Sequence, residues 1–121
     1  MKKEAAMTIR QAADYIQARI VSGTSLSDTE IVSACGSDMM SDVMAFFHGQ
    51  GMLLTGLINV QVVRTANLMD IKAVCFVRGK KPNEEMIKLA GEMDIVLMQT
   101  DLPMFTACGI LYREGLSGTQ E

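Results

Sequence analysis

The chain has 121 residues, of which 49% are hydrophobic, and its 14 acidic and 11 basic residues give a net charge of −3. This length fits one domain, and the hydrophobic content excludes a disordered chain. The charge balance argues against a nucleic-acid-binding protein, which needs a dense basic face. No run approaches the ~20 apolar residues of a membrane span and no signal peptide is visible, so we expect a cytoplasmic protein without a membrane partner.

The three cysteines, Cys35, Cys75 and Cys108, lie in apolar segments and form no C-x-x-C pair. An odd number without regular spacing argues against a disulfide framework or a zinc site. We therefore expect reduced, buried thiols, no metal and no cofactor.

The first elements are predicted from local signals. A helix is expected to begin at Thr8, because Gln11 follows at the spacing of a capping box. Two strands, at 18–21 and 30–35, should flank a polar loop at 24–28, and each can run parallel or antiparallel to its neighbours.

The next helix is predicted to be capped by Asp38 or Ser41 and to stop at Gly49 and Gly51. Its predicted apolar face consists of Met40, Val43, Met44 and Phe47.

From residue 52 the pattern becomes regular: apolar strands at 52–55, 73–77 and 95–98 are each followed by a polar loop and a helix. The last helix should end at Gly115, with 117–121 as a frayed tail. The three predicted helices have apolar faces at Val60, Val63 and Ala66, then Met86, Leu89, Ala90 and Met93, then Phe105, Cys108 and Tyr112.

This alternation is typical of buried parallel strands joined by right-handed crossovers. It predicts a single α/β domain over 1–121, with a core from about 8 to 116, containing a mainly parallel sheet of about five strands with flanking helices in two or three layers.

Open parallel sheets bind ligands beyond the carboxyl ends of their strands. The segments 55–59, 78–81 and 100–101 should leave the sheet there, each beside a helix N-terminus. Hydroxyls, glycine backbone and cations suit an anionic ligand such as a phosphate or nucleotide. The candidate ligand-binding residues are Thr55, Gly56, Asn59, Arg64, Thr65, Arg78, Gly79, Lys80 and Thr100. In the alternative interpretation the glycines only form turns, Asn59 and Thr100 only cap helices, and the cations are solvated.

Other chemistry is less well supported. The pair Gly79-Lys80 is not a phosphate-binding P-loop, because position 74 is Val and Lys81 follows the lysine. The single histidine, His48, falls at a predicted helix C-terminus, where the dipole favours a cation. Asp38 and Asp42 share a helical face and could hold magnesium or act as acid and base, but a cap is favoured.

The 11 methionines are expected mainly in the core, where a flexible thioether fills gaps. A dimer seam formed by Met40, Met44 and Phe47 is the second interpretation.

Several segments together resemble the small stand-alone proteins of the DRTGG-domain family, over about residues 8–116. The segments are Asp38-Met39-Met40-Ser41-Asp42-Val43; Leu54-Thr55-Gly56-Leu57 with Gln61, Arg64, Thr65 and Ala66; Val77-Arg78-Gly79-Lys80 with Pro82; and Thr100, Gly109-Ile110-Leu111 and Gly115-Leu116. The literal Asp-Arg-Thr-Gly-Gly is absent, and its nearest equivalents are Val63-Arg64-Thr65 and Arg78-Gly79-Lys80.

The resemblance implies a fold similar to the N-terminal domain of HPr kinase/phosphorylase, without the separate kinase domain. Family members also occur beside CBS domains in regulatory pyrophosphatases and beside dethiobiotin-synthetase-like domains in phosphotransacetylases. These settings imply a regulatory, dimer-forming module.

We therefore expect a non-enzymatic regulatory domain and a homodimer, which senses a small anionic metabolite or nucleotide and acts on a partner enzyme or regulator. The alternatives are a protein-interaction adaptor without a small ligand, and a metal-dependent phosphate-handling enzyme using Asp38 and Asp42.

Overall fold

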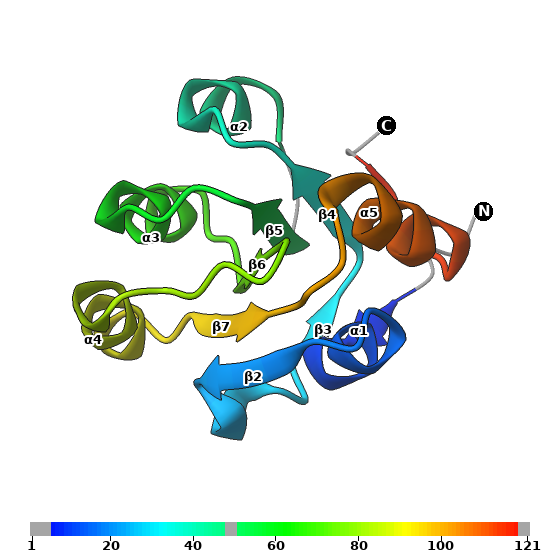
Figure 1. The fold of residues 1–121 in the computed structure, drawn as a ribbon, viewed down its shortest axis with the longest axis horizontal. Helices are drawn as coiled ribbons and strands as arrows, with labels where there is room; N and C mark the ends of the chain where they lie inside the picture. The colour runs from blue at the N-terminus through cyan, green and yellow to red at the C-terminus, as the bar shows by residue number, and fades with distance from the viewer. Residues whose placement is uncertain (1–5, 48–50, 119–121) are drawn as a thin grey trace.

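The computed structural model describes residues 6–47 and 51–118. Its centre is a five-stranded sheet in the order β2-β7-β6-β5-β4 (Figure 1). Strands β4 to β7 are parallel and β2 is antiparallel to β7, which confirms the mainly parallel sheet. The strands are β2 (Arg19–Ser22), β4 (Ser33–Gly36), β5 (Gly51–Thr55), β6 (Ala73–Phe76) and β7 (Val96–Gln99).

Helices cover both faces of this sheet. The crossovers α2 (Met40–Phe46), α3 (Val60–Leu68) and α4 (Glu84–Glu92) join consecutive neighbouring strands. Because right-handed crossovers that advance in one direction stay on one side, all three pack on the same face. Helices α1 (Ile9–Tyr15) and α5 (Met104–Arg113) cover the other face, giving three layers (Figure 1).

The core is divided in two by the sheet. Along β6, Ala73 and Cys75 belong to the half under α1 and α5, whereas Val74 and Phe76 belong to the half under α2 to α4. All four are fully buried. Burial on both faces explains why the sequence of β5, β6 and β7 is continuously apolar rather than alternating.

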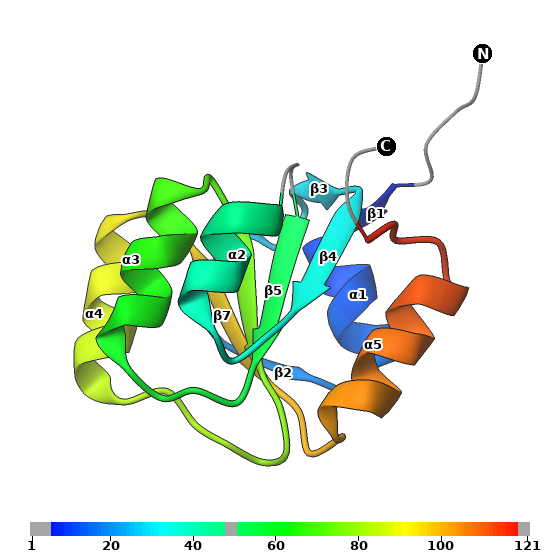
Figure 2. The same ribbon diagram turned by 90° about the horizontal axis from the view of Figure 1, so that it is seen from above.

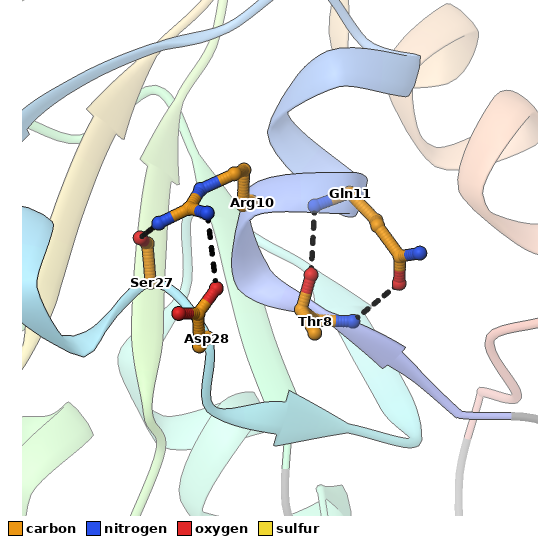
Figure 3. A network of polar contacts seen from close by, with 5 residues as sticks. All are labelled: Thr8, Arg10, Gln11, Ser27 and Asp28. Atoms are coloured by element: carbon orange, nitrogen blue, oxygen red, sulfur yellow. Dashed lines mark hydrogen bonds and ion pairs between the residues drawn. The ribbon is translucent and has the colours of Figure 1, made fainter.

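The N-terminal part is held by a short second sheet and by polar contacts. Strands β1 (Met7–Thr8) and β3 (Glu30–Ile31) pair antiparallel. The predicted capping box is confirmed: Gln11 N donates to Thr8 Oγ1 (3.1 Å), and Thr8 N donates to Gln11 Oε1 (2.9 Å) (Figure 3). Arg10 contacts Ser27 Oγ (2.7 Å) and Asp28 Oδ1 (3.1 Å), which ties the loop after β2 to α1.

That loop contains a 3-10 turn at Thr24–Leu26. The strand predicted at 30–35 is two strands, β3 and β4, which pair in different sheets.

The predicted apolar face of α5 is wrong. Phe105 and Tyr112 are 88% and 74% exposed, while Ala107 and Leu111 are buried. No charged residue stands between Met104 and Tyr112, so the hydrophobic period could not select a face.

The predictions around α2 also need correction. The N-cap is Met39, which makes no side-chain cap bond, so neither Asp38 nor Ser41 caps the helix. Gly51 begins β5 instead of stopping α2. His48 and Gly49 lie outside the described residues.

The predicted dimer seam is not available as a surface, because Met40 and Phe47 are only 9% and 2% exposed. Most of the other methionines fill the core as expected: Met52, Met86 and Met98 are fully buried.

The predicted tail begins later than expected. Ser117 N donates to Val32 O (3.1 Å), and Ala34 N donates to Ser117 O (2.9 Å), so Ser117 pairs alongside β4.

Of the thiols, only Cys75 is buried, whereas Cys35 and Cys108 are partly exposed. Burial raises the pKa of Cys75 to about 12. Across the described residues, no helix has the length and apolar content needed to cross a membrane.

Candidate functional site

The carboxyl ends of β4 to β7 line one edge of the sheet, because these strands are parallel and adjacent. The register pairs Thr55 with Phe76 and Phe76 with Gln99. Thr55, Arg78 and Thr100 therefore leave the sheet on the same side, as the sequence predicted. The loops that follow β5, β6 and β7 run along the bottom of Figure 2. We call this rim, formed by the loops at 37–39, 56–59, 77–83 and 100–103, the strand-end edge.

Thr55 joins two loops of this edge. Its hydroxyl donates to Asp38 Oδ1 (3.0 Å) and accepts from Leu57 N (3.1 Å), and Gly56 N donates to the same carboxylate oxygen (2.7 Å). Thr55 is fully buried. Its hydroxyl therefore holds the edge together and is not free to bind a ligand.

Asp38 is a residue of this edge that the sequence analysis assigned to a helix cap. Its position just after a predicted strand could have indicated this, because polar side chains of binding sites in parallel sheets lie beyond the carboxyl ends of the strands. The hydrogen bonds that Asp38 accepts from other described residues, Thr55 and Gly56, both end on Oδ1, so these residues leave Oδ2 as an acceptor.

Thr100 and Asn59 also serve the fold. The Thr100 hydroxyl donates to Ile16 O (2.7 Å) and accepts from Leu102 N (3.2 Å), with the residue 3% exposed. Asn59 Oδ1 accepts from Gln61 N (2.8 Å) and caps α3. For Asn59 the capping interpretation is confirmed. Thr100 does not cap α5, whose N-cap is Pro103.

The turn at Arg78 differs from the other polar parts of the edge. Arg78 has φ 58° and Gly79 has φ 73°, and Lys80 N donates to Val77 O (3.1 Å). Two left-handed central residues define a type I′ turn, which normally requires Gly, Asn or Asp. An arginine in this conformation costs about 1–2 kcal/mol.

Neighbouring backbone holds this strained turn in place. Arg78 N donates to Leu102 O and Gly79 N donates to Thr100 O, both at 2.9 Å. The other left-handed residues that are not glycine, Gln17, Asp70 and Asp94, each follow the end of a helix, where this conformation is ordinary. Among the described residues, Arg78 is thus the left-handed side chain that no helix end explains, and such strain is concentrated at functional sites.

The Arg78 guanidinium lies against Gly56. A Cβ built on Gly56 would stand 2.5 Å from Arg78 Nη2 and 3.6 Å from Asp38 Oδ1. Gly56 therefore provides bare backbone between a cation and a carboxylate. Arg78 and Lys80 are exposed, and neither takes part in an ion pair with the residues that the structure describes.

The remaining candidates on α3 lie away from this cluster. Arg64 is exposed and lines a hollow of about 200 Å³ with Glu85 and Lys88 of α4. Thr65 is 1% exposed, and its hydroxyl has no hydrogen-bond partner in the described structure. Thr65 lines a different hollow, together with Met44 and Leu68, and no residue of the strand-end edge contributes to that hollow.

Asp42 lies in the first turn of α2 and is exposed. Within 6–47 and 51–118, no group of three or more His, Cys, Asp or Glu side chains is arranged to hold a metal ion.

Comparison with known proteins gives a relationship of fold. No family model and no curated protein matches the chain. A similar solved structure is the crystal structure of the CBS and DRTGG domains of the regulatory region of Clostridium perfringens pyrophosphatase, complexed with its activator diadenosine tetraphosphate. The TM-score is 0.69 at 14% sequence identity, and the match covers 91% of this chain and 48% of that chain.

The chain thus spans about half the length of that regulatory region. The likeness supports the DRTGG-like α/β fold predicted from the sequence. Membership of the family and similarity to the N-terminal domain of HPr kinase/phosphorylase stay predictions.

Proposed function

We propose that this chain is a non-catalytic regulatory domain that binds a small anionic ligand at the strand-end edge, with Arg78 and Lys80 as its cationic contacts. The observation that carries the proposal is the strained, exposed Arg78, whose guanidinium lies against Gly56 and forms no ion pair with any residue in 6–47 or 51–118. The similar fold of a regulatory region crystallised with a nucleotide activator supports it.

The edge would bind phosphate through side chains. The backbone N–H groups of Gly56, Arg78, Gly79 and Lys80 are all used within the protein. A backbone cradle of the P-loop kind is therefore not formed here. A guanidinium, by contrast, presents a planar set of donors that matches two phosphate oxygens.

The carboxylate of Asp38 limits which anionic ligands can bind at this edge. Its carboxylate repels a phosphate placed directly over Gly56, but its free Oδ2 can accept a hydrogen bond from a hydroxyl. A ligand that carries both phosphate and sugar hydroxyls satisfies both groups. Nucleotides and sugar phosphates therefore fit this edge better than inorganic phosphate does.

The proposal assigns binding and no chemical step. The Thr55 hydroxyl contacts a carboxylate, an arrangement that can activate a nucleophile, but Thr55 is fully buried and cannot reach a ligand. The exposed groups, a guanidinium and an ammonium, bind and orient anions.

The test is isothermal titration calorimetry of the full chain with AMP, ADP, ATP, glucose 6-phosphate and inorganic phosphate. We expect binding of a nucleotide or sugar phosphate, and Arg78→Ala should weaken it by about 1.5–3 kcal/mol, the value of a charge-assisted contact. That loss corresponds to roughly a 10- to 150-fold higher Kd.

Two further variants test the position of the Arg78 guanidinium separately from the total charge of the chain. Gly56→Ala keeps every charge but places a Cβ where the Arg78 guanidinium lies, so binding should also weaken. Arg113→Ala removes a cation that pairs with Glu114 on α5, and binding should not change. No binding by any of the five compounds at millimolar concentration would refute the ligand role and favour an adaptor.

A further inference from the structure

Two exposed apolar side chains lie at the strand-end edge beside its polar groups. Phe105, in the first turn of α5, follows the loop at 100–103 and is 88% exposed. Met39, in the loop after β4, is 59% exposed. The edge therefore offers an apolar surface in addition to the cations of the loop after β6.

Both side chains belong to the part of the edge where β4 ends. A Cβ built on Gly36, the last residue of β4, would stand 3.0 Å from Met104 Sδ, so the start of α5 lies against the end of this strand. Phe105 is the next residue along α5, and Met39 comes three residues after Gly36. Figure 2 shows the first turn of α5 on the same side of the molecule as the loops after β5 and β6.

The order of the strands sets the order of the chemical groups along the edge. Strands β4, β5 and β6 are consecutive neighbours. The apolar side chains lie at the end of β4, the Asp38 carboxylate is bonded to Thr55 at the end of β5, and the turn that contains Arg78 follows β6. Neighbouring strands are about 4.8 Å apart, so this row of apolar, acceptor and cationic groups extends over roughly 10 Å.

A nucleotide carries its groups in the same order, with an aromatic base, then ribose hydroxyls, then phosphate. We propose that the ligand of the strand-end edge is a nucleotide whose base stacks on Phe105 and contacts Met39. The ribose then donates a hydrogen bond to Asp38 Oδ2, and the phosphates contact Arg78 and Lys80. This inference rests on the proposed function and narrows its ligand from phosphorylated metabolites in general to nucleotides.

The two apolar side chains suit a base. Every base has a flat π-face that stacks on an aromatic ring, whichever base it is. A methionine thioether makes favourable contacts with aromatic rings and adapts to their shape. Because these contacts use ring faces and no hydrogen bonds, we expect ADP and GDP to bind with similar affinity.

The charges of the edge explain why a base contact matters. Three exposed cations follow β6 and form no ion pair with the residues in 6–47 and 51–118: Arg78, Lys80 and Lys81. Two carboxylates lie close to them. Asp38 is bonded to Gly56 N, and Asp101 Oδ1 would stand 3.4 Å from a Cβ built on Gly79. These carboxylates offset part of the attraction for phosphate, so the base has to contribute a share of the affinity.

The test compares a nucleotide with its fragments by isothermal titration calorimetry of the full chain. The compounds are ADP, ribose 5-phosphate and inorganic pyrophosphate. We expect ADP to have a Kd at least 10-fold lower than either fragment. Phe105→Ala should raise the Kd of ADP by about 5- to 150-fold, the effect of losing one base–aromatic stack, and leave that of ribose 5-phosphate unchanged. Arg78→Ala should raise the Kd of both compounds.

Helix α5 provides a matched control. Tyr112 is also exposed, at 74%, but lies seven residues further along the helix, about 10 Å from Phe105. Tyr112→Ala should therefore leave the Kd of ADP unchanged. Phe105→Tyr keeps the ring and should retain binding, whereas Phe105→Leu keeps only an apolar side chain and should not. Circular dichroism checks that each variant is folded.

The possible outcomes separate this inference from the proposed function. If ADP and ribose 5-phosphate bind equally and Phe105→Ala has no effect, the inference is refuted while the anionic site at Arg78 stands. Equal weakening of ADP by Phe105→Ala and Tyr112→Ala also refutes it, because the effect would then not depend on position at the edge. If none of the three compounds binds at millimolar concentration, the proposed function fails, and this inference fails with it.

Discussion

Thr55, which ends β5, and Thr100, which directly follows β7, contrast with Arg78 in the loop after β6, the strand between them. Thr55 and Thr100 are buried, and each hydroxyl has two protein partners. Arg78 is exposed, strained and unpaired within the described structure. A position directly after a parallel strand thus predicts that a residue lies at this edge. Whether its side chain is free to bind a ligand depends on the hydrogen bonds that it already makes within the protein.

The largest change in stability is expected for Thr100→Val, which tests whether the buried hydroxyl serves the fold. The change leaves Ile16 O and Leu102 N without their partner inside the protein. We expect the free energy of unfolding to fall by about 3 kcal/mol, because buried unpaired groups lose their full desolvation energy. Chemical denaturation measures the change.

Thr106→Val is the matched control, since Thr106 is exposed on α5. Its effect should stay within about 0.5 kcal/mol. Equal effects of the two substitutions would show that the Thr100 hydroxyl does not hold the edge together.

Thr65 sharpens the comparison, because it is as buried as Thr55 and Thr100 but its hydroxyl has no partner in the described structure. Thr65→Val replaces an unpaired buried hydroxyl with a methyl group of similar size. The free energy of unfolding should rise by about 1 kcal/mol. A loss of stability would instead indicate a hydrogen bond to a buried water molecule.

The smallest expected effect belongs to Arg78→Gly. Glycine removes the left-handed strain of about 1–2 kcal/mol but increases the entropy of the unfolded chain by up to ~1 kcal/mol. The net result should be about 0.5 kcal/mol of added stability together with lost ligand binding. Thermal unfolding and calorimetry on the same sample measure both.

A loss of both stability and binding in Arg78→Gly would mean that the arginine serves the fold. A gain of stability with unchanged binding would place the ligand elsewhere.

Much of the fold could be predicted because its signals are local. The apolar runs of β5, β6 and β7 arise from burial on both faces of the sheet, and the boundaries of these strands agree within about one residue. Asn59 and Asn83 cap α3 and α4 through bonds to backbone two or three residues away. Such contacts depend only on nearby sequence.

Errors occurred where contacts join distant parts of the chain. The outward face of α5 could not be selected, because the helix carries no charge before Arg113 at its last position and so has no distinctive polar side. Ser117 looked like a free tail, yet it bonds to Val32, 85 residues away. Asp38 looked like a cap, but its partners are Thr55 at the end of β5 and Gly56 directly after it.

By itself the sequence determined the alternation of strands and helices, and with it the edge at which three loops meet, since hydrophobic period and caps act over a few residues. Only the tertiary structure decided which polar groups at that edge are occupied. The Thr100 hydroxyl donates to Ile16 O, 84 residues earlier. The backbone N–H groups of Arg78 and Gly79 donate to the loop after β7 and hold the turn, and the Arg78 guanidinium lies against Gly56. Burial and hydrogen bonding between distant segments separate the groups that build the edge from those left exposed to bind.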